Sequence, residues 1–261
     1  MIEAGLGIWS IAIPAFLLAA LMVAERVWPR RQLVLGRYPR WLTHAFFFLA
    51  NAAVGRILAF IMVVAVAANW SAQNQFGLYY ATKLPWWLET GLAVIILDFA
   101  VWLQHVALHR VPLLWRMHAV HHSDRDLDAT TALRFHPFEL IVSTLYKSAW
   151  VALLGVPVLV ALAFELWLNA NALFNHSNIR LPAWVDRWLR KLLVTPDMHL
   201  VHHSILPNDQ RTNFGFALTI WDRLFGTYGA HQSEQPIGLA DLQDTRPAKI
   251  GWSLLLPFRK I

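Results

Sequence analysis

The sequence predicts an all-α, multi-pass membrane protein, a bundle of about four transmembrane helices or helical hairpins. Apolar residues make up 57% of its 261 residues and its mean hydropathy is +0.43, whereas soluble domains are about 45–50% apolar. Many of these residues form runs long enough to cross a bilayer, which takes about 20 residues of helix. A third signal is that histidines follow these runs in short blocks at helical spacings.

The first apolar run, residues 4–24, predicts a membrane helix. No basic segment precedes it, as a cleaved signal peptide would require, so we expect this helix to be retained. Arginines follow the run, and the positive-inside rule therefore places this loop in the cytoplasm and the N-terminus outside. These arginines are Arg26, Arg30, Arg31, Arg37 and Arg40.

A second apolar run covers residues 41–70 and is interrupted by Asn51 and Arg56. A charged side chain at that depth is costly, so Arg56 is expected to face protein or to reach an interface. The third run, residues 86–104, returns the chain to the cytoplasm and delivers His105 there.

Residues 139–172 are too many for one straight crossing. As a single helix they would measure about 50 Å, whereas one crossing needs about 30 Å. Such a helix would also place His176 on the opposite side of the membrane from His105. Because Gly155 and Pro157 lie near the middle, we predict a helical hairpin that returns His176 to the cytoplasmic face.

After residue 179 the chain becomes amphipathic. In TPDMHLVHHS at 195–204, the threonine, proline and aspartate suit the N-cap, first position and first turn of a short helix. The chain thus divides into N-terminal transmembrane helices (1–85), a catalytic region (86–230) and a C-terminal tail without recognisable chemistry (231–261).

Charge and cysteine content narrow the chemistry. The net charge of +6 rests largely on arginines beside the apolar runs, which suits an anionic membrane surface and gives no reason to expect a nucleic-acid partner. The absence of cysteine excludes disulfides, cysteine-ligated iron–sulfur clusters and thiolate-bound haem. Histidine, with aspartate or glutamate as possible additional ligands, must therefore hold any metal, and imidazole suits zinc, copper, iron and nickel alike.

Ten of the twelve histidines fall between residues 105 and 203. The spacings H-x3-H and H-x2-H-H place them on shared helix faces, and buried imidazoles in such numbers indicate metal binding. His136 precedes a proline and an apolar helix, so it is either a ligand or an N-cap. His44 and His231 are expected to be ordinary. The remaining predicted ligands are His105, His109, His118, His121, His122, His176, His199, His202 and His203.

Polar and aromatic residues near the histidines are further candidates. Asp98 lies on one helical stripe with Trp102, His105 and His109. It is predicted to hydrogen-bond a ligand imidazole or another polar group of the bundle, and the alternative is an interfacial acid paired with arginine. Trp102 is a lesser candidate for substrate contact. The acidic run at 124–128 predicts a solvated loop.

Several classes of enzyme are excluded by missing motifs. The chain has no H-E-x-x-H, no G-x-S-x-G and no P-loop. No G-x-G-x-x-G follows a predicted strand, so no nicotinamide or flavin module is visible.

The order and spacing of the histidine motifs resemble the fatty acid hydroxylase/sterol desaturase superfamily of membrane di-iron oxygenases, over roughly residues 86–230. The first motif is D-x3-W-x2-H-x3-H at 98–109, where the family often has tyrosine in place of Trp102. The others are LWRMHAVHHSD at 114–124, TALRFHPFE at 131–139, FNHSNIRLP at 174–182, TPDMHLVHHS at 195–204 and NFGFALTIWDRLFGTY at 213–228.

This resemblance implies a four-helix membrane bundle with a cytosolic helical cap that holds a dimetal site. The metals would be two irons (zinc is an alternative in isolated protein), held by the nine histidines named above together with His136. The implied activity is O2-dependent hydroxylation of a C–H bond in a fatty acyl, sterol or related lipid. Electrons would come from an external donor, ferredoxin- or cytochrome-type with its reductase. The implied location is the membrane, the inner one in a bacterium, with the metals on the cytoplasmic side.

Two alternatives stay open. A lipid or sterol desaturase would use the same di-iron site. A non-catalytic membrane zinc-binding protein or transporter is of another class, but transport sites usually lie near the bilayer midplane, whereas these histidines are predicted at helix ends and in cytosolic loops.

Overall fold

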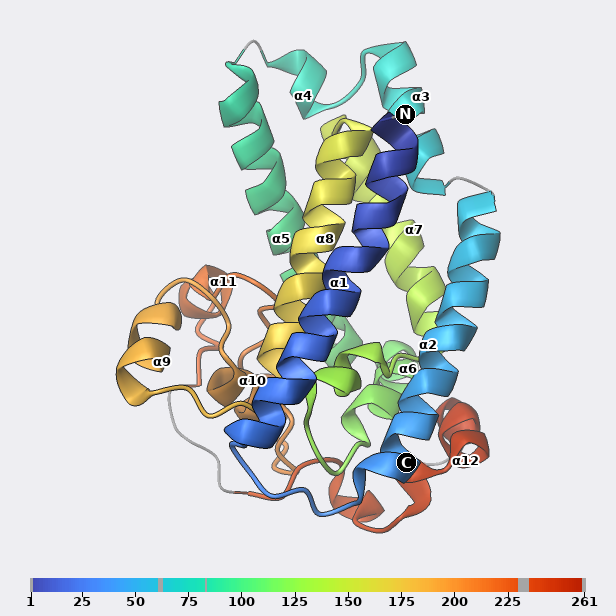
Figure 1. The fold of residues 1–261 in the computed structure, drawn as a ribbon. Helices are drawn as coiled ribbons and strands as arrows, with labels where there is room; N and C mark the ends of the chain where they lie inside the picture. The colour runs from blue at the N-terminus through green and yellow to red at the C-terminus, as the bar shows by residue number, and fades with distance from the viewer. Residues whose placement is uncertain (1, 61–62, 83, 230–234, 260–261) are drawn as a thin grey trace.

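The computed structural model describes residues 2–60, 63–82, 84–229 and 235–259, and every regular element within these ranges is helical. The predicted all-α class is thereby confirmed. Long helices run side by side and form the body of the molecule (Figure 1). They are α1 (Ile2–Val27), α2 (Arg37–Phe60), α5 (Trp86–Arg110), α7 (Pro137–Leu154) and α8 (Val158–His176).

Shorter helices gather at one end of these long helices, and we call them the cap (Figure 1). The cap comprises α6 (Pro112–His122), α9 (Ala183–Leu189), α10 (Pro196–His202), α11 (Ile220–Leu224) and α12 (Ile250–Leu255). Short 3₁₀ turns connect them, at Ala129–Leu133 (η1), Asp209–Arg211 (η2), Ala240–Leu242 (η3), Arg246–Ala248 (η4) and Leu256–Phe258 (η5). The opposite end carries α3 (Val63–Asn74) and α4 (Leu78–Ala81).

Among the residues that the structure describes, two helices, α5 and α8, are long and apolar enough to cross a membrane. Several long helices also leave large apolar side chains exposed, among them Phe16, Leu49, Leu153 and Leu162. A lipid-facing surface accounts for such exposure, because contiguous apolar surface is unusual on soluble monomers. These features support membrane association.

The second apolar run, residues 41–70, is divided between two helices of the described residues. Helix α2 already begins at Arg37 and ends at Phe60, and a second helix, α3, starts at Val63. This second helix packs along α7. Arg56 is exposed on the surface of α2 instead of facing protein.

The reversal predicted within residues 139–172 is present. Helix α7 ends at Leu154, Gly155 takes the left-handed conformation with φ 71°, and Pro157 leads into α8. A side chain at Gly155 is excluded, because a Cβ there would lie 2.7 Å from the carbonyl oxygen of Phe76. The turn brings His176, the last residue of α8, back to the cap.

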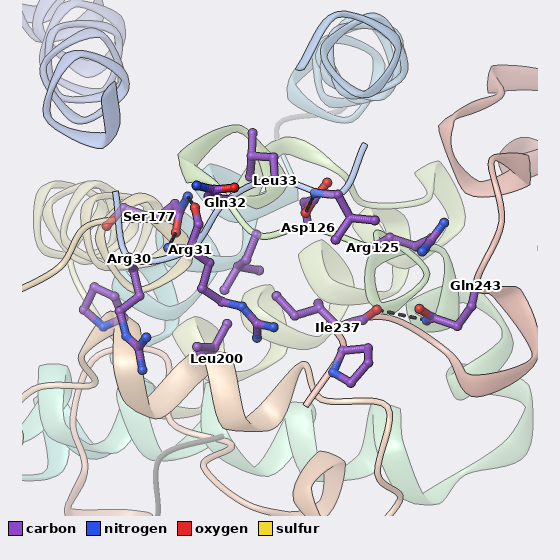
Figure 2. Close-up of a pocket in the computed structure, with 15 residues that line it drawn as sticks. Arg30, Arg31, Gln32, Leu33, Arg125, Asp126, Ser177, Leu200, Ile237 and Gln243 are labelled. Carbon is purple, nitrogen blue, oxygen red and sulfur yellow. Dashed lines mark hydrogen bonds between the residues drawn. The ribbon is translucent and has the colours of Figure 1, made fainter. Parts of the chain in front are cut away.

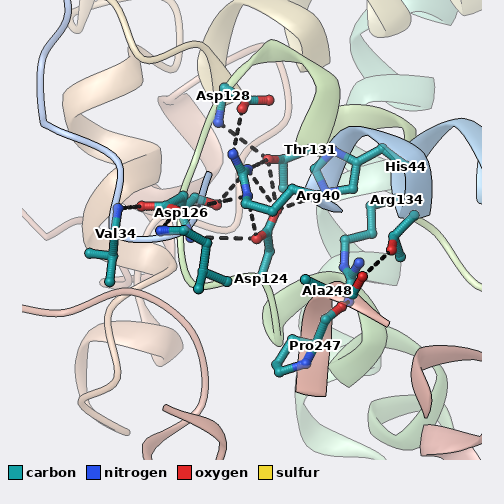
Figure 3. A network of polar contacts seen from close by, with 12 residues as sticks. Val34, Arg40, His44, Asp124, Asp126, Asp128, Thr131, Arg134, Pro247 and Ala248 are labelled. Carbon is teal, nitrogen blue, oxygen red and sulfur yellow. Dashed lines mark hydrogen bonds and ion pairs between the residues drawn. The ribbon is translucent and has the colours of Figure 1, made fainter. Parts of the chain in front are cut away.

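The sequence predicted a solvated loop for the acidic run at 124–128, and this prediction is wrong. Asp124, Asp126 and Asp128 are all buried around Arg40 (Figure 3). The Arg40 guanidinium donates to both carboxylate oxygens of Asp124, at 2.7 and 2.8 Å, and to Asp128 Oδ2 at 2.6 Å. Burial alone would raise the pKa of Asp124, but the Arg40 charge holds it well below its ordinary value.

The same network fixes the segment between α1 and α2. The Asp126 carboxylate accepts the backbone N–H groups of Val34 and Leu35, at 2.7 and 2.8 Å. The sequence placed Arg40 among the arginines of a cytoplasmic loop, but its role lies inside the protein. Removal of Arg40 would leave the buried carboxylates without a compensating charge.

Two arginines of the segment between α1 and α2 also bind within the protein. Arg30 Nε lies 2.7 Å from Asp197 Oδ1 at the start of α10, and Arg31 Nη1 donates to the Gln235 carbonyl at 2.9 Å. The segment lines a pocket of about 210 Å³, into which the Arg31 side chain projects between Leu200 and Ile237 (Figure 2). These contacts fasten the segment to the cap.

The described part of the predicted C-terminal tail is packed against the bundle. Leu239, Leu242 and Leu256 form one apolar cluster with Phe47 of α2 and Val120 of α6. The tail therefore contributes to the core of the cap.

Glu25 joins α1 to two segments of the cap. Its buried Oε1 accepts the backbone N–H groups of Ala129, at 2.7 Å, and Asn178, at 2.8 Å. Burial raises the pKa of Glu25 to about 7, and the nearby Asp128 carboxylate adds to the rise. The folded protein therefore holds a proton on this group at pH values where the unfolded chain has lost it.

This difference predicts a pH-dependent effect of Glu25→Gln. Between the unfolded pKa of 4.5 and the folded value of about 7, the wild-type free energy of unfolding falls as pH rises, because the folded state binds more protons. Glutamine keeps an oxygen for both N–H groups but cannot ionise. We expect the variant to gain stability relative to wild type from pH 5 to pH 8, by on the order of 1–3 kcal/mol, as measured by thermal unfolding in detergent. Glu25→Ala, which leaves both N–H groups unpaired, should be less stable at every pH, and a pH-independent difference between Gln and wild type would contradict the assignment.

Candidate metal centre

Nine of the ten histidines predicted as ligands lie together where the cap meets the ends of α5 and α8. They form two groups, and within each group the ligand nitrogens are all within 4.8 Å of one another. The groups are adjacent, because the rings of His122 and His203 stack with their centroids 4.3 Å apart. The five-histidine group is His105, His109, His118, His122 and His202, and the four-histidine group is His121, His176, His199 and His203.

The repeated H-x2-H-H motif explains how two short helices serve both groups. In α6, His118 and His122 are one turn apart and join the five-histidine group, while His121, on a neighbouring face, joins the other. At α10 the arrangement is reversed. His199 and His203, one turn apart, belong to the four-histidine group, and His202 belongs to the five-histidine group. The long helices complete the set with His105 and His109 from α5 and His176 from α8.

Backbone carbonyls fix the tautomer of several of these rings. The Nδ1 of His105 lies 2.8 Å from the Phe214 carbonyl, and that of His202 lies 2.7 Å from the Thr212 carbonyl. A carbonyl only accepts, so each Nδ1 must carry the hydrogen. In the neutral ring the Nε2 atom then carries no hydrogen, and its lone pair is free to bind a cation.

These Nε2 lone pairs face one another. His105 Nε2 lies 3.1 Å from both His118 Nε2 and His202 Nε2. In the other group, His176 Nε2 lies 3.0 Å from the Nε2 atoms of His121 and His199, and its own Nδ1 donates to the Ala172 carbonyl at 2.7 Å. In the five-histidine group, acceptors fix the Nδ1 hydrogens of His105, His118 and His202, so no hydrogen lies between their Nε2 lone pairs, and these repel unless a cation lies among them. The donor set therefore fits a metal ion in each group.

Other ring nitrogens give the same indication. Both nitrogens of His122, a fully buried residue, have no hydrogen-bond partner, and neither does His109 Nε2. Leaving a buried polar atom unpaired is costly. Burial lowers the pKa of the cap imidazoles well below 6.5 and neighbouring histidines lower it further, so these rings are neutral near pH 7. This holds for His121, His122, His199, His202 and His203.

Glu139 is a supporting residue that the sequence did not identify. Its Oε1 lies 2.8 Å from His118 Nδ1, and both residues are buried. Such a carboxylate orients an imidazole and raises its basicity toward a metal. Its sequence position, in the first turn of the helix that follows His136, gave no indication of this contact.

The carboxylate predicted for that role, Asp98, lies elsewhere. Its Oδ2 accepts from Trp221 Nε1 at 2.7 Å, so it bonds another polar group of the bundle and not a metal-group histidine. Trp102 has a related role, because its Nε1 donates to Asp222 at 3.0 Å. Asp222 also accepts the backbone N–H of Phe214 at 2.9 Å, and thereby holds the carbonyl that orients His105.

His136 is the predicted ligand that the structure does not bring to either group. It is the N-cap of α7, where its Nδ1 accepts the backbone N–H of Phe138 at 3.2 Å. Its Nε2 lies 3.2 Å from the Leu254 carbonyl. Both nitrogens thus have partners, which is the capping alternative that the sequence left open.

Neither of the two histidines expected to be ordinary is assigned to a metal group. His44 is buried between Thr130 Oγ1, at 2.7 Å, and Asp124 Oδ2, at 2.9 Å, in the Arg40 network. His231 lies outside the described residues.

Comparison with known proteins identifies relatives of this chain. The fatty acid hydroxylase family model matches residues 90–227. The ornithine lipid hydroxylase OlsE of Rhizobium tropici is 29% identical over 83% of this chain and 63% of its own length. Human (Homo sapiens) alkylglycerol monooxygenase is 29% identical over 66% of this chain and 38% of its own. The fatty acid hydroxylase vlmA of a Lecanicillium species is 30% identical over 69% and 52%. No solved structure matches the chain.

The chain therefore spans less than two thirds of the length of these relatives. The matched region nevertheless includes the nine grouped histidines, Glu139 and Asp222.

The geometry predicts different outcomes for two histidine variants. His122→Ala removes an imidazole with two unpaired nitrogens from the five-histidine group, so it should lower the metal content of purified protein. His136→Ala removes only a cap, so it should retain the metal and cost about 1 kcal/mol of stability. Elemental analysis and thermal unfolding measure both. Metal loss in His136→Ala equal to that in His122→Ala would restore His136 as a ligand.

Proposed function

Because this chain belongs to the fatty acid hydroxylase family, we propose that it is a membrane-bound hydroxylase that inserts oxygen into a C–H bond of a lipid. The observation that carries the proposal is the pair of buried histidine groups whose Nε2 lone pairs converge. The relatives named above are themselves lipid hydroxylases and monooxygenases, which supports this reaction class.

The two groups would each hold one iron, and their ligands are the nine histidines of the cap. Iron in this setting supplies reductive activation of O2, chemistry that amino-acid side chains do not provide. The protein's own contribution is to keep the imidazoles neutral and oriented. Glu139 and the carbonyls of Thr212 and Phe214 do this by fixing the Nδ1 hydrogens.

The proposed reaction is R–H + O2 + 2 e⁻ + 2 H⁺ → R–OH + H2O. One oxygen atom enters the lipid, and the other leaves as water. The sequence shows no redox module, so the two electrons would come from a separate carrier protein of the ferredoxin or cytochrome type, served by a reductase.

A cavity of about 160 Å³ lies beside the five-histidine group and fits an apolar chain. It lies between α5, α7 and α8, and His105 forms part of its wall. Most of the remaining wall is apolar, from Val101, Leu108, Phe135, Leu140, Leu168 and Phe216. An acyl or similar chain seated here would place one carbon next to the metal group while the wall excludes water.

The cavity wall also carries polar side chains paired with one another. Gln104 Nε2 donates to Ser143 Oγ at 2.7 Å, and Lys147 pairs with Glu165 of α8 at 2.6 Å. Polar groups along the wall suit a lipid with a hydrogen-bonding group near the reactive carbon, as opposed to a pure hydrocarbon. The substrate would thus be amphiphilic and would enter from the bilayer.

The proposed placement in the membrane follows the sequence. Residues 86–230 would form the catalytic region, the helices before it would complete about four crossings, and the cap would face the cytoplasm. Basic residues in the segment between α1 and α2 support this side, although Arg40 is buried.

The chemical outcome is predicted to be hydroxylation. Lipid extracts of a host with and without the gene, compared by mass spectrometry, should show an O2-dependent product heavier by one oxygen, absent with His122→Ala. A product lighter by two hydrogens would instead identify a desaturase. Protein that retains zinc but never iron when purified without oxygen, and that consumes no O2 with a reductant, would identify a non-catalytic zinc protein.

The substrate cavity is tested by filling it. Leu140→Trp places an indole in the wall of the cavity, so it should lower product formation at least tenfold while iron content stays unchanged, since Leu140 contacts the cavity and is not a ligand. Leu145→Trp is the matched control on the exposed side of the same helix, where the side chain is 52% exposed, and it should retain activity. Equal activity in both variants would mean that the substrate binds elsewhere.

A further inference from the structure

One histidine of the two metal groups reaches the protein surface. Eight of the nine are buried, whereas His109 is partly exposed. His109 Nε2 has no hydrogen-bond partner, so this ring stays available to the five-histidine group. Its exposed edge opens into a surface pocket. None of the residues of the four-histidine group lines this pocket.

The pocket has a volume of about 300 Å³ and lies where α5 passes into α6. Together with His109, its wall consists of Arg110, Pro112, Trp115, Pro207, Gln210 and Arg211. We call it the His109 pocket. Among the described residues, no acidic side chain lines it, and Asp209, one residue before Gln210, is buried.

The rim of the His109 pocket is positively charged. Arg110 and Arg211 are exposed, and so is Arg116 on the next turn of α6. Clustered guanidinium groups create a local positive potential that attracts acidic partners and speeds their association. Trp115 adds an apolar surface, and its ring contacts the rings of His109 and His122, with centroids 5.1 and 5.6 Å away.

We propose that the His109 pocket is the docking surface for an acidic one-electron carrier protein, which delivers electrons to the five-histidine metal group past His109 and Trp115. This inference rests on the proposed function, because only a metal site that consumes electrons needs a docking surface for an electron carrier. The carrier loses one electron per encounter, so two encounters supply the two electrons of one hydroxylation.

Other pockets fit this role less well. The pocket beside Arg31 is also basic, but no histidine lines it (Figure 2). The cavity beside His105 reaches the same metal group, but its wall is mainly apolar and fits the lipid chain. His105 and His109 are one helical turn apart on α5, so a single turn presents the metal group to both openings.

The test compares charge-reversed variants in anaerobic reduction. Iron-loaded protein in detergent is mixed with a reduced, small acidic [2Fe–2S] ferredoxin, and electron transfer is followed by absorbance at several salt concentrations. Arg110→Glu and Arg211→Glu should each slow the second-order rate about tenfold or more at low salt, and the difference should shrink at high salt. Arg187→Glu, on exposed α9, is the matched control and should keep the wild-type rate.

Two further measurements separate docking from damage to the metal site. A small neutral photoreductant should reduce all variants at the wild-type rate. Binding of the oxidised ferredoxin to metal-free protein should weaken in the same two variants, a result that does not depend on iron or on lipid oxidation. The proposed function is tested separately, by iron content and lipid product.

Three results would overturn the proposal. One is a wild-type ferredoxin rate in both rim variants at low salt. Another is slow reduction in Arg125→Glu, at the pocket beside Arg31, with normal reduction in Arg110→Glu. The third is wild-type protein that accepts electrons from the photoreductant and none from the ferredoxin at any salt concentration.

Discussion

The constraint on which the cap depends is that nine imidazoles, eight of them buried and His109 partly exposed, are held close together. His105, His118 and His202 each present Nε2 to the same small volume, and the groups on their Nδ1 atoms prevent the hydrogen from moving to the Nε2 side. Such an arrangement is unfavourable on its own, since it combines desolvation with repulsion between lone pairs. The fold must therefore hold these rings in place by other contacts, and a bound cation would convert the repulsion into coordination. Metal binding and the stability of the cap are linked in this way.

Those other contacts come mainly from buried charged side chains. Arg40 and Arg134 both fasten the chain where α6 ends: Arg40 through Asp124, and Arg134 through the Val120 carbonyl at 2.9 Å. Asp222 fixes the backbone of Phe214 on the other side of the five-histidine group. Buried ion pairs are weak evidence for stability, but losing one partner is strongly destabilising, so they favour one geometry over alternatives. In this cap they hold the histidine-bearing ends of α6 and α5, where small displacements would separate the ligand nitrogens.

The sequence predicted the parts of this arrangement that follow from local spacing. The H-x3-H and H-x2-H-H motifs, the turn at Gly155 and the start of α10 at Pro196 depend on helical period and turn chemistry, which act within a few residues. The roles of Glu139, Asp124 and Arg40 were not predicted, because each depends on a partner far away in the chain; Arg40 and Asp124 are 84 residues apart. An acidic run and an arginine-rich loop have the same composition whether they face solvent or each other. His136 shows the opposite case, since local sequence indicated a cap correctly and the family resemblance favoured a ligand.

The placement of His105 and His109 explains how one helix can serve two different requirements of the proposed reaction. A lipid hydroxylase must admit an apolar chain without water and must also receive electrons from a water-soluble protein. On α5 these two histidines are one turn apart, so both belong to the five-histidine group while each borders a different pocket. His105 borders the apolar cavity between the long helices, and His109 borders the basic pocket at the turn into α6. Among the described residues, α5 is also one of two helices long and apolar enough to cross a membrane, and both histidines lie near the end of this helix. The five-histidine group therefore lies between an apolar cavity and a basic surface pocket, and one turn of α5 connects it to both.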